Sequence, residues 1–214
     1  MRHRLYDPDI SDFAKPQTTF WSASAGEHRR FAAARLTEDL SVDCAVIGGG
    51  YCGMSAAHRL ARNGLSVAVL EAGSEIGWGA SGMNGGFVSA GGTMLGEAQM
   101  VRRVGEDEAR RFSTSQAAAA TDLRYFIDET AIDCDVTGDG NFCVAHSERM
   151  ASALKSEADE ARSCGHDVDF IDGDTFRRDF QDGREAFGAI RIRPAFGVHP
   201  LRLLLGMADA AARA

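Results

Sequence analysis

The stretch that decides the fold runs from Val42 to Gly73 and reads VDCAVIGGGYCGMSAAHRLARNGLSVAVLEAG. Apart from Asp43, its first residues, 42–47, are β-branched or apolar and predict a strand buried on both faces of a parallel sheet. Residues 51–63 follow helical spacing, and Gly64 is a typical helix terminator. A second strand is expected over 65–71, so the stretch predicts a strand, helix, strand unit.

Three glycines between the first strand and the helix, Gly48, Gly50 and Gly53, fit the pattern G-x-G-x-x-G. In that pattern Gly48 permits the tight turn out of the strand and Gly50 lets the backbone approach a pyrophosphate, whereas Gly53 lets the helix pack closely on the sheet. The first amides of the helix then face the phosphate charge. The pattern alone is weak, because a glycine turn in another α/β protein also fits it.

The acidic residue Glu71 gives the pattern its weight, because it ends the second strand about 20 residues beyond Gly50. A carboxylate at this place can accept hydrogen bonds from both ribose hydroxyls of an adenosine, and it repels a 2'-phosphate. The sequence therefore favours FAD or NAD over NADP. We count Tyr51 and Cys52, which stand inside the motif, and Ala72, which follows Glu71, with the expected cofactor-binding residues.

A second glycine-rich segment follows the unit, and its clearest part is GWGASGMNGG, residues 77–86. So many glycines in one place indicate either close backbone approach to a ligand or a mobile surface loop. Periodicity does not decide between the two, since the segment has none.

With its two glycine-rich segments, the chain resembles the amino-terminal part of FAD-dependent amine and amino-acid oxidoreductases of the D-amino-acid-oxidase superfamily, especially the gamma-glutamylputrescine oxidoreductase-like branch. The resemblance implies that the second segment wraps the flavin side of FAD. It extends the cofactor contacts to Gly79, Ala80, Ser81, Gly82, Asn84, Gly85 and Gly86. Met83 is left out, because family members usually have Arg at this place.

The expected fold class is α/β, with a Rossmann-like FAD-binding βαβ start and an inserted α+β portion that carries an antiparallel sheet. We expect an amino-terminal arm over 1–41, the first part of the FAD-binding domain over 42–130 and part of a substrate domain over 131–198. Residues 199–214 would begin the return to the FAD domain. In the arm, Phe20 and Trp21 are candidate anchors, although a partly ordered terminus is an equal alternative.

Further elements are expected along the rest of the chain. Residues 132–147 contain two short runs with a strand pattern, joined by TGDG, which is a hairpin signal. Helices are expected over 97–130, 147–164, 173–180 and 200–214, with Ser147 capping the second of them. Strands are expected over 166–172 and, single or paired, over 187–200.

Composition excludes several functional classes. The formal net charge of -8 argues against binding nucleic acid, and no apolar run is long enough for a signal peptide or a membrane span, so a cytoplasmic protein is expected. The five cysteines show no C-x-x-C spacing, and the six histidines are scattered, so neither a disulfide framework nor a metal site is indicated.

The function implied by the resemblance is oxidation of an amine or amino acid by hydride transfer to FAD, with this chain supplying the ADP-binding half. No catalytic residue is assigned. Arg191 and Arg193 could bind a substrate carboxylate, although an exposed strand face explains them better. Since the chain resembles about the first half of such an enzyme, a carboxy-terminal half or a complementing chain is expected. The alternatives are an inactive nucleotide-binding fragment and, less favoured, an NAD-dependent dehydrogenase.

Overall fold

The computed structural model describes the chain except residues 1–11, 16–17, 27–34, 91–94, 164 and 182. The chain divides into two compact units, each built from segments that are separated in the sequence. Unit 1 comprises residues 1–86, 127–136 and 198–214, and unit 2 comprises residues 87–126 and 137–197. The domain boundaries expected from the sequence stay a prediction.

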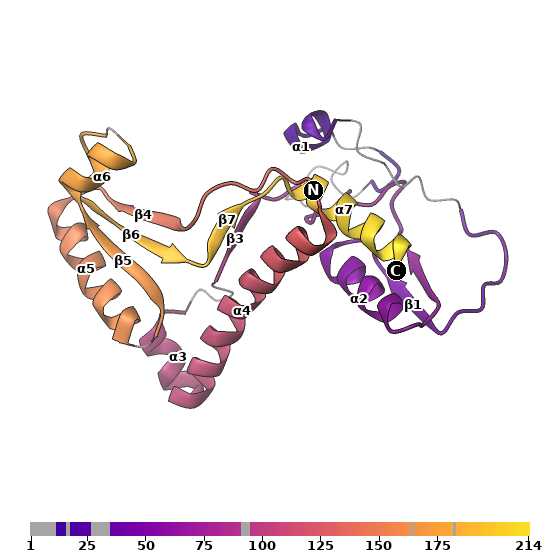
Figure 1. Cartoon of the computed structure of the whole chain (residues 1–214), viewed down its shortest axis with the longest axis horizontal. Coiled ribbons are helices and arrows are strands. Elements are labelled where there is room, and N and C mark those ends of the chain that lie inside the picture. Colours follow the sequence, from indigo (N-terminus) through magenta and orange to yellow (C-terminus); the bar gives the residue numbers. More distant parts are fainter. Residues whose placement is uncertain (1–11, 16–17, 27–34, 91–94, 164, 182) are drawn as a thin grey trace, which may run out of the picture. The chain divides into compact units, whose positions relative to one another are not determined.

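Unit 1 contains the expected strand, helix, strand motif, with β1 (Cys44–Ile47), α2 (Tyr51–Arg62) and β2 (Val67–Leu70) (Figure 1). The two strands are parallel, and Cys44 lies opposite Val67. On α2, Met54 and Ala57 are buried. The helix ends where the sequence predicts, because Gly64 adopts a positive φ of 81° and its amide donates to the carbonyl of Ala61.

The prediction that the first strand is buried on both faces is wrong. Exposure alternates along β1, and the side chain of Ile47 is 89% exposed. The reason is that β1 pairs only with β2 among the described residues, and α2 packs on this two-stranded sheet. An apolar run indicates that a strand is hydrophobic, but it does not show whether one or both faces of that strand are buried.

The core of unit 1 is made largely by α7 (Pro200–Arg213), which packs against α2. His199 caps this helix: its Nδ1 accepts from the amide of Arg202 at 3.2 Å, and the imidazole is buried. The expected helix over 200–214 is therefore confirmed. Its buried residues are Pro200, Leu201, Leu203, Leu204, Leu205, Met207, Ala208 and Ala210.

The amino-terminal arm forms a short helix, α1 (Phe20–Ser24), which packs against α7. Trp21 anchors the arm as expected, since its ring meets that of His199 edge-on at a centroid distance of 4.9 Å. Phe20 is no anchor, because its side chain is 72% exposed. Adjacent side chains in a helix point in different directions, so of Phe20 and Trp21 only Trp21 faces the core.

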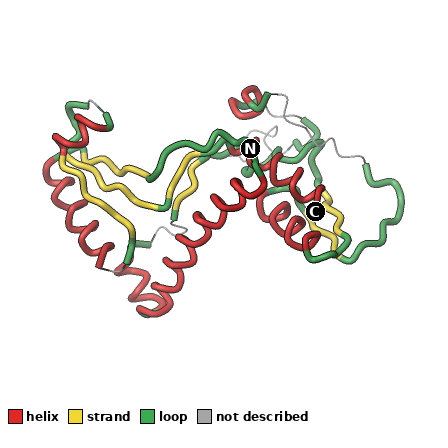
Figure 2. The backbone as a smooth tube through the Cα atoms, in the orientation of Figure 1, coloured by secondary structure: helices red, strands yellow, loops and turns green. Residues whose placement is uncertain are grey.

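Unit 2 contains two antiparallel sheets (Figure 2). In the larger sheet β6 (Gly188–Arg193) lies between β4 (Asn141–Ala145) and β5 (Asp167–Asp172). In the smaller sheet β3 (Phe87–Ser89) pairs with β7 (Ala195–Gly197). The antiparallel portion that the sequence predicts is therefore confirmed.

Helices complete unit 2. The amphipathic α5 (Glu148–Ser163) packs on the larger sheet, and the hydroxyl of Ser147 caps it by accepting from the amide of Met150. The short α6 (Gly173–Asp179) follows β5. The helical region expected over 97–130 consists of two helices, α3 (Glu97–Val104) and α4 (Glu106–Thr130), which Gly105 separates. The main core cluster contains Ala145, Ala151, Leu154, Ala158, Val168 and Ile190.

The hairpin expected over 132–147 is wrong in its pairing. The TGDG turn exists, with positive φ at Gly138 and Gly140, but β4 after it pairs with β6. Before the turn, Thr137 bridges to Gly197, whereas Ile132 is buried in unit 1 beside Gly206. Both runs therefore have partners distant in the sequence, and these partners replace the local pairing.

Candidate functional site

The glycine loop after β1, residues 48–53, has the geometry that its pattern predicts. Gly48 adopts a positive φ of 98°, and its amide donates to the carbonyl of Leu70 at 2.7 Å, which ties the loop to β2. A side chain at Gly53 would overlap the carbonyl oxygen of Gly48. Glycine is thus required at both ends of the loop, for backbone conformation at one and for close packing at the other.

Amide groups at the start of α2 are available to a ligand. Its cap residue, Gly50, has no side chain to satisfy the first amides. Within the described part of the chain, the amides of Gly50, Cys52 and Gly53 have no acceptor. Several unpaired N–H groups at a helix amino terminus form an anion site, because the helix dipole adds to their partial charges. These residues therefore fit a pyrophosphate.

The carboxylate of Glu71 lies beside this loop and holds it in shape. Its Oε2 accepts from the amide of Gly49 at 2.7 Å, and its Oε1 accepts from the amide of Gly73 at 2.8 Å. A carboxylate has about four acceptor positions, so two remain for ribose hydroxyls. The sequence assigned Glu71 to the ribose alone and missed its role in the loop.

Gly49, which the motif leaves unspecified, is a second residue that the sequence reasoning missed. A side chain there would come within 2.5 Å of the Cγ2 atom of Ile76 and within 3.0 Å of Oε2 of Glu71. The run of three consecutive glycines in the sequence was the available signal.

The second glycine-rich segment, residues 77–86, is tightly packed on unit 1. Gly77 and Gly86 have positive φ values of 87° and 71°. A side chain at Gly77 would lie 2.6 Å from Cδ1 of Leu201, one at Gly86 would overlap the carbonyl of Val198, and one at Gly82 would overlap that of Gly77. These contacts contradict the alternative of a mobile surface loop, because backbone is packed against backbone at several points.

Asn84 fixes the conformation of this segment. Its side-chain amide donates to the carbonyls of Ala80 and Ser81, both at 3.1 Å, and its Oδ1 accepts from the amide of Gly86 at 2.8 Å. By contrast, Gly79, Ala80 and Gly85 are exposed. The segment thus combines a fixed turn with an exposed backbone surface.

The two glycine-rich segments meet at Tyr51 and Ser81. The amide of Tyr51 donates to the hydroxyl of Ser81 at 3.1 Å, and the Tyr51 hydroxyl donates to the carbonyl of Pro200 at 3.0 Å. Burial raises the pKa of Tyr51, so its hydroxyl keeps its proton at neutral pH. The structure therefore brings together Gly48, Gly50, Gly53, Glu71 and Ser81, which the sequence placed in two separate segments.

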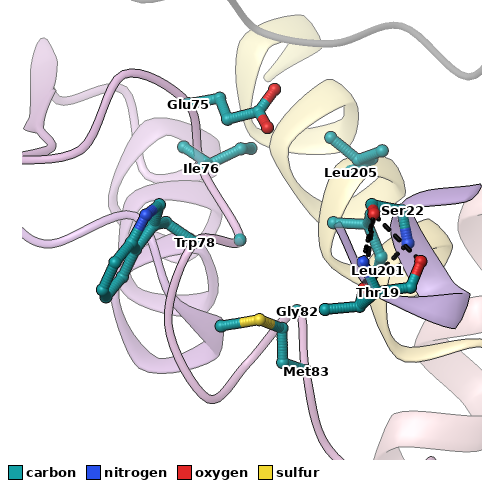
Figure 3. A pocket seen from close by; sticks show the side chains of 10 residues that line it. Thr19, Ser22, Glu75, Ile76, Trp78, Gly82, Met83, Leu201 and Leu205 are labelled. Atoms are coloured by element: carbon teal, nitrogen blue, oxygen red, sulfur yellow. Dashed lines mark hydrogen bonds between the residues drawn. The ribbon is translucent and has the colours of Figure 1, made fainter. Parts of the chain in front are cut away.

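A narrow cavity lies between the second segment, α1 and α7 (Figure 3). Trp78 and Met83 line it from the segment, Ile76 lines it from just before the segment, and Leu201 and Leu205 line it from α7. Its volume of about 20 Å³ accommodates a single water molecule. It is thus a packing defect and not a place for a flavin ring.

The other charged candidates are engaged elsewhere. Arg191 pairs with Asp139, at 2.7 Å from its carboxylate, and Arg193 pairs with Asp167 and Asp169. The two aspartates raise the pKa of Arg193. This supports a strand-surface role for both arginines over binding of a substrate carboxylate, because their guanidinium groups already have acidic partners.

Neither a metal site nor a membrane-spanning helix occurs among the described residues. No group of His, Cys, Asp and Glu side chains in this part of the chain has the arrangement of a metal site. Among the same residues, no helix combines the length and hydrophobicity needed to cross a bilayer.

Comparisons with known proteins agree with this geometry. A family model described as FAD dependent oxidoreductase matches residues 43–214. The chain is 32% identical over 194 residues to gamma-glutamylputrescine oxidoreductase of Escherichia coli K12, covering 90% of the chain and 44% of that protein. It thus spans less than half the length of this relative. The resemblance inferred from the two glycine-rich segments is confirmed.

Solved structures show the same fold. Glycine oxidase of Bacillus cereus superposes with a TM-score of 0.57 at 27% identity, over 80% of the chain and 44% of that protein. L-α-glycerophosphate oxidase of Mycoplasma pneumoniae, solved with FAD bound, superposes with a TM-score of 0.60 over 82% of the chain and 43% of that protein. At 14% identity, this second likeness concerns the fold alone.

Proposed function

The chain belongs to the family of FAD dependent oxidoreductases, and from this premise we propose that its unit 1 binds the ADP part of FAD in a protein that oxidises an amine or amino acid. Bound FAD would supply the acceptor for a hydride taken from the carbon next to the amine nitrogen. The residues of this chain bind and orient the cofactor. Location in the cytoplasm stays part of the proposal.

One observation carries the assignment: unpaired amides at the start of α2 lie in the loop that Glu71 holds. We assign the pyrophosphate to the amides of Gly50, Cys52 and Gly53, with Gly48 forming the turn. The remaining acceptor positions of Glu71 are assigned to the ribose hydroxyls. Tyr51 lies between Gly50 and Cys52, and Ala72 follows Glu71, so both stay among the proposed cofactor-binding residues.

The second segment is assigned to the rest of the cofactor. Its exposed residues Gly79, Ala80 and Gly85 offer backbone to a ligand, and Ser81 adds a hydroxyl beside α2. Gly82, Asn84 and Gly86 keep the turn in shape, as their packing and hydrogen bonds indicate.

The substrate class rests on the relatives. Both gamma-glutamylputrescine and glycine, which name two of the similar enzymes, are molecules with an amino group. We therefore propose an amine or amino acid as the substrate of the whole protein.

A titration of the 214-residue chain with FAD, followed by flavin fluorescence, tests the assignment. AMP should displace FAD, whereas adenosine 2',5'-bisphosphate, which differs from AMP only by its 2'-phosphate, should compete more weakly, because the Glu71 carboxylate repels that phosphate. Equal competition by the two nucleotides would contradict the role of Glu71. Absence of any flavin binding would reject the proposal that unit 1 holds the cofactor.

A further inference from the structure

The first helix after the glycine loop has no cap of its own. Gly50 stands at the cap position without a side chain, and in its place Ser81 accepts from the amide of Tyr51 at 3.1 Å. Ser81 lies 30 residues further along the chain, in the second glycine-rich segment. A side-chain oxygen bound to one of the first helical amides acts as a cap wherever it lies in the sequence.

We propose that Ser81 is a positioning residue, which caps α2 from the second segment and so joins both glycine-rich segments into one preassembled cofactor site. This inference rests on the proposed function only for the identity of the cofactor. The cap itself exists without a ligand, because both partners belong to the chain.

Packing around Ser81 supports a specific contact. A side chain at Gly50 would come within 2.9 Å of the Ser81 hydroxyl oxygen, so glycine at position 50 makes room for this hydroxyl as well as for a phosphate. Asn84 holds the Ser81 carbonyl from the other side at 3.1 Å. Ser81 is therefore held at its carbonyl by Asn84 and at its hydroxyl by the amide of Tyr51, so its side chain has a defined position.

The Ser81 hydroxyl can form a further hydrogen bond besides the one that caps α2. A serine hydroxyl accepts up to two hydrogen bonds and donates one. The Tyr51 amide uses one acceptor position, and no residue in the described part of the chain accepts the proton of Ser81. The hydroxyl can therefore remain the cap of α2 while it donates to an oxygen of the cofactor phosphates.

A second link strengthens the junction. Through its hydroxyl, Tyr51 donates to the carbonyl of Pro200 at the start of α7. Tyr51 thus connects the loop after β1, the second segment and α7. Loss of the Ser81 hydroxyl should free the backbone amide of Tyr51 but leave the hydrogen bond between the Tyr51 hydroxyl and Pro200 intact.

The Ser81→Ala variant tests the inference in the 214-residue chain. Without FAD, hydrogen exchange of the Tyr51 amide should become about tenfold faster, as expected for a lost helix cap. The Kd for FAD should rise by about the same factor. Ser81→Thr retains the hydroxyl and should restore both values. Ser55→Ala removes an exposed hydroxyl from α2 and serves as the control that should change neither.

Several outcomes would overturn the inference. Unchanged exchange at Tyr51 in Ser81→Ala would exclude the cap, and faster exchange with an unchanged Kd would exclude a role in cofactor positioning. Weaker FAD binding in both Ser81→Ala and Ser55→Ala would show a general effect of losing a hydroxyl. If the wild-type chain binds no FAD, the proposed function fails, but the exchange measurement still decides whether Ser81 caps α2.

Discussion

The two glycine-rich segments reach their conformations in different ways. In residues 48–53 the close contacts lie within the loop and with residues 71–81, since Gly53 packs on the carbonyl of Gly48 and Gly49 packs on Ile76. In residues 77–86 several contacts come from the far end of the chain, from Val198 and Leu201. The first segment is therefore held by residues within about 30 positions of it, whereas the second also depends on the docking of α7.

The sharpest test of this difference is Gly86→Ala, because the added methyl group would overlap the carbonyl oxygen of Val198. We expect a loss of about 3 kcal/mol in the free energy of unfolding, measured by chemical denaturation. Gly79→Ala is the matched control, since no atom lies within 4 Å of the added carbon. Equal stability of the two variants would show that the backbone of the second segment shifts to accommodate the added methyl group at little cost.

Glu71→Arg changes the residue that holds the first segment and should affect both the loop and the ligand. We expect FAD binding to weaken by on the order of 2 kcal/mol, because charge-assisted hydrogen bonds to the ribose and to the loop are lost. Titration of the variant with FAD measures this loss. Glu38→Arg, which makes the same change of charge at an exposed position, should bind FAD as the wild type does. Unaltered flavin binding in Glu71→Arg would show that the ribose assignment is wrong.

Asn84→Ala removes the side-chain hydrogen bonds that shape the second segment and should cost about 1–2 kcal/mol of stability. Hydrogen exchange should rise at Gly86, whose amide loses its acceptor, and stay unchanged at Gly48, whose amide donates to the carbonyl of Leu70. The companion variant Asn84→Asp keeps an acceptor for Gly86 and should preserve protection there. Increased exchange in both segments would mean that they unfold together, and it would contradict the idea that they are held by different parts of the chain.

The smallest effect is expected for Tyr51→Phe, which removes the hydroxyl that donates to the carbonyl of Pro200 and also interacts with the side chain of Asn84. A loss of about 1 kcal/mol in the free energy of unfolding should result, measured by denaturation. Tyr125→Phe, at a tyrosine whose side chain is 69% exposed, is the matched control. If both variants are as stable as the wild type, the link from α2 to α7 contributes nothing measurable.

Sequence patterns predicted elements whose signals are local. The helix over 51–63, its glycine terminator and the helix that begins at Pro200 were read correctly, because periodicity and capping residues lie within each element. The predictions that were wrong concern which strands pair with each other and which strand faces are buried. The apolar run of β1 did not reveal the exposure of Ile47, and the TGDG turn did not reveal that β4 pairs with β6.

By itself, the sequence determined the strand, helix, strand unit, the glycine loop and the resemblance to flavoenzymes, because each depends on residues close together in the chain. Only the tertiary structure decided that Glu71 holds the loop at Gly49, that Ser81 caps α2 and that Val198 leaves room only for glycine at Gly86. These contacts join residues that are distant in sequence, and no periodicity or spacing encodes which distant atoms meet when α7 docks.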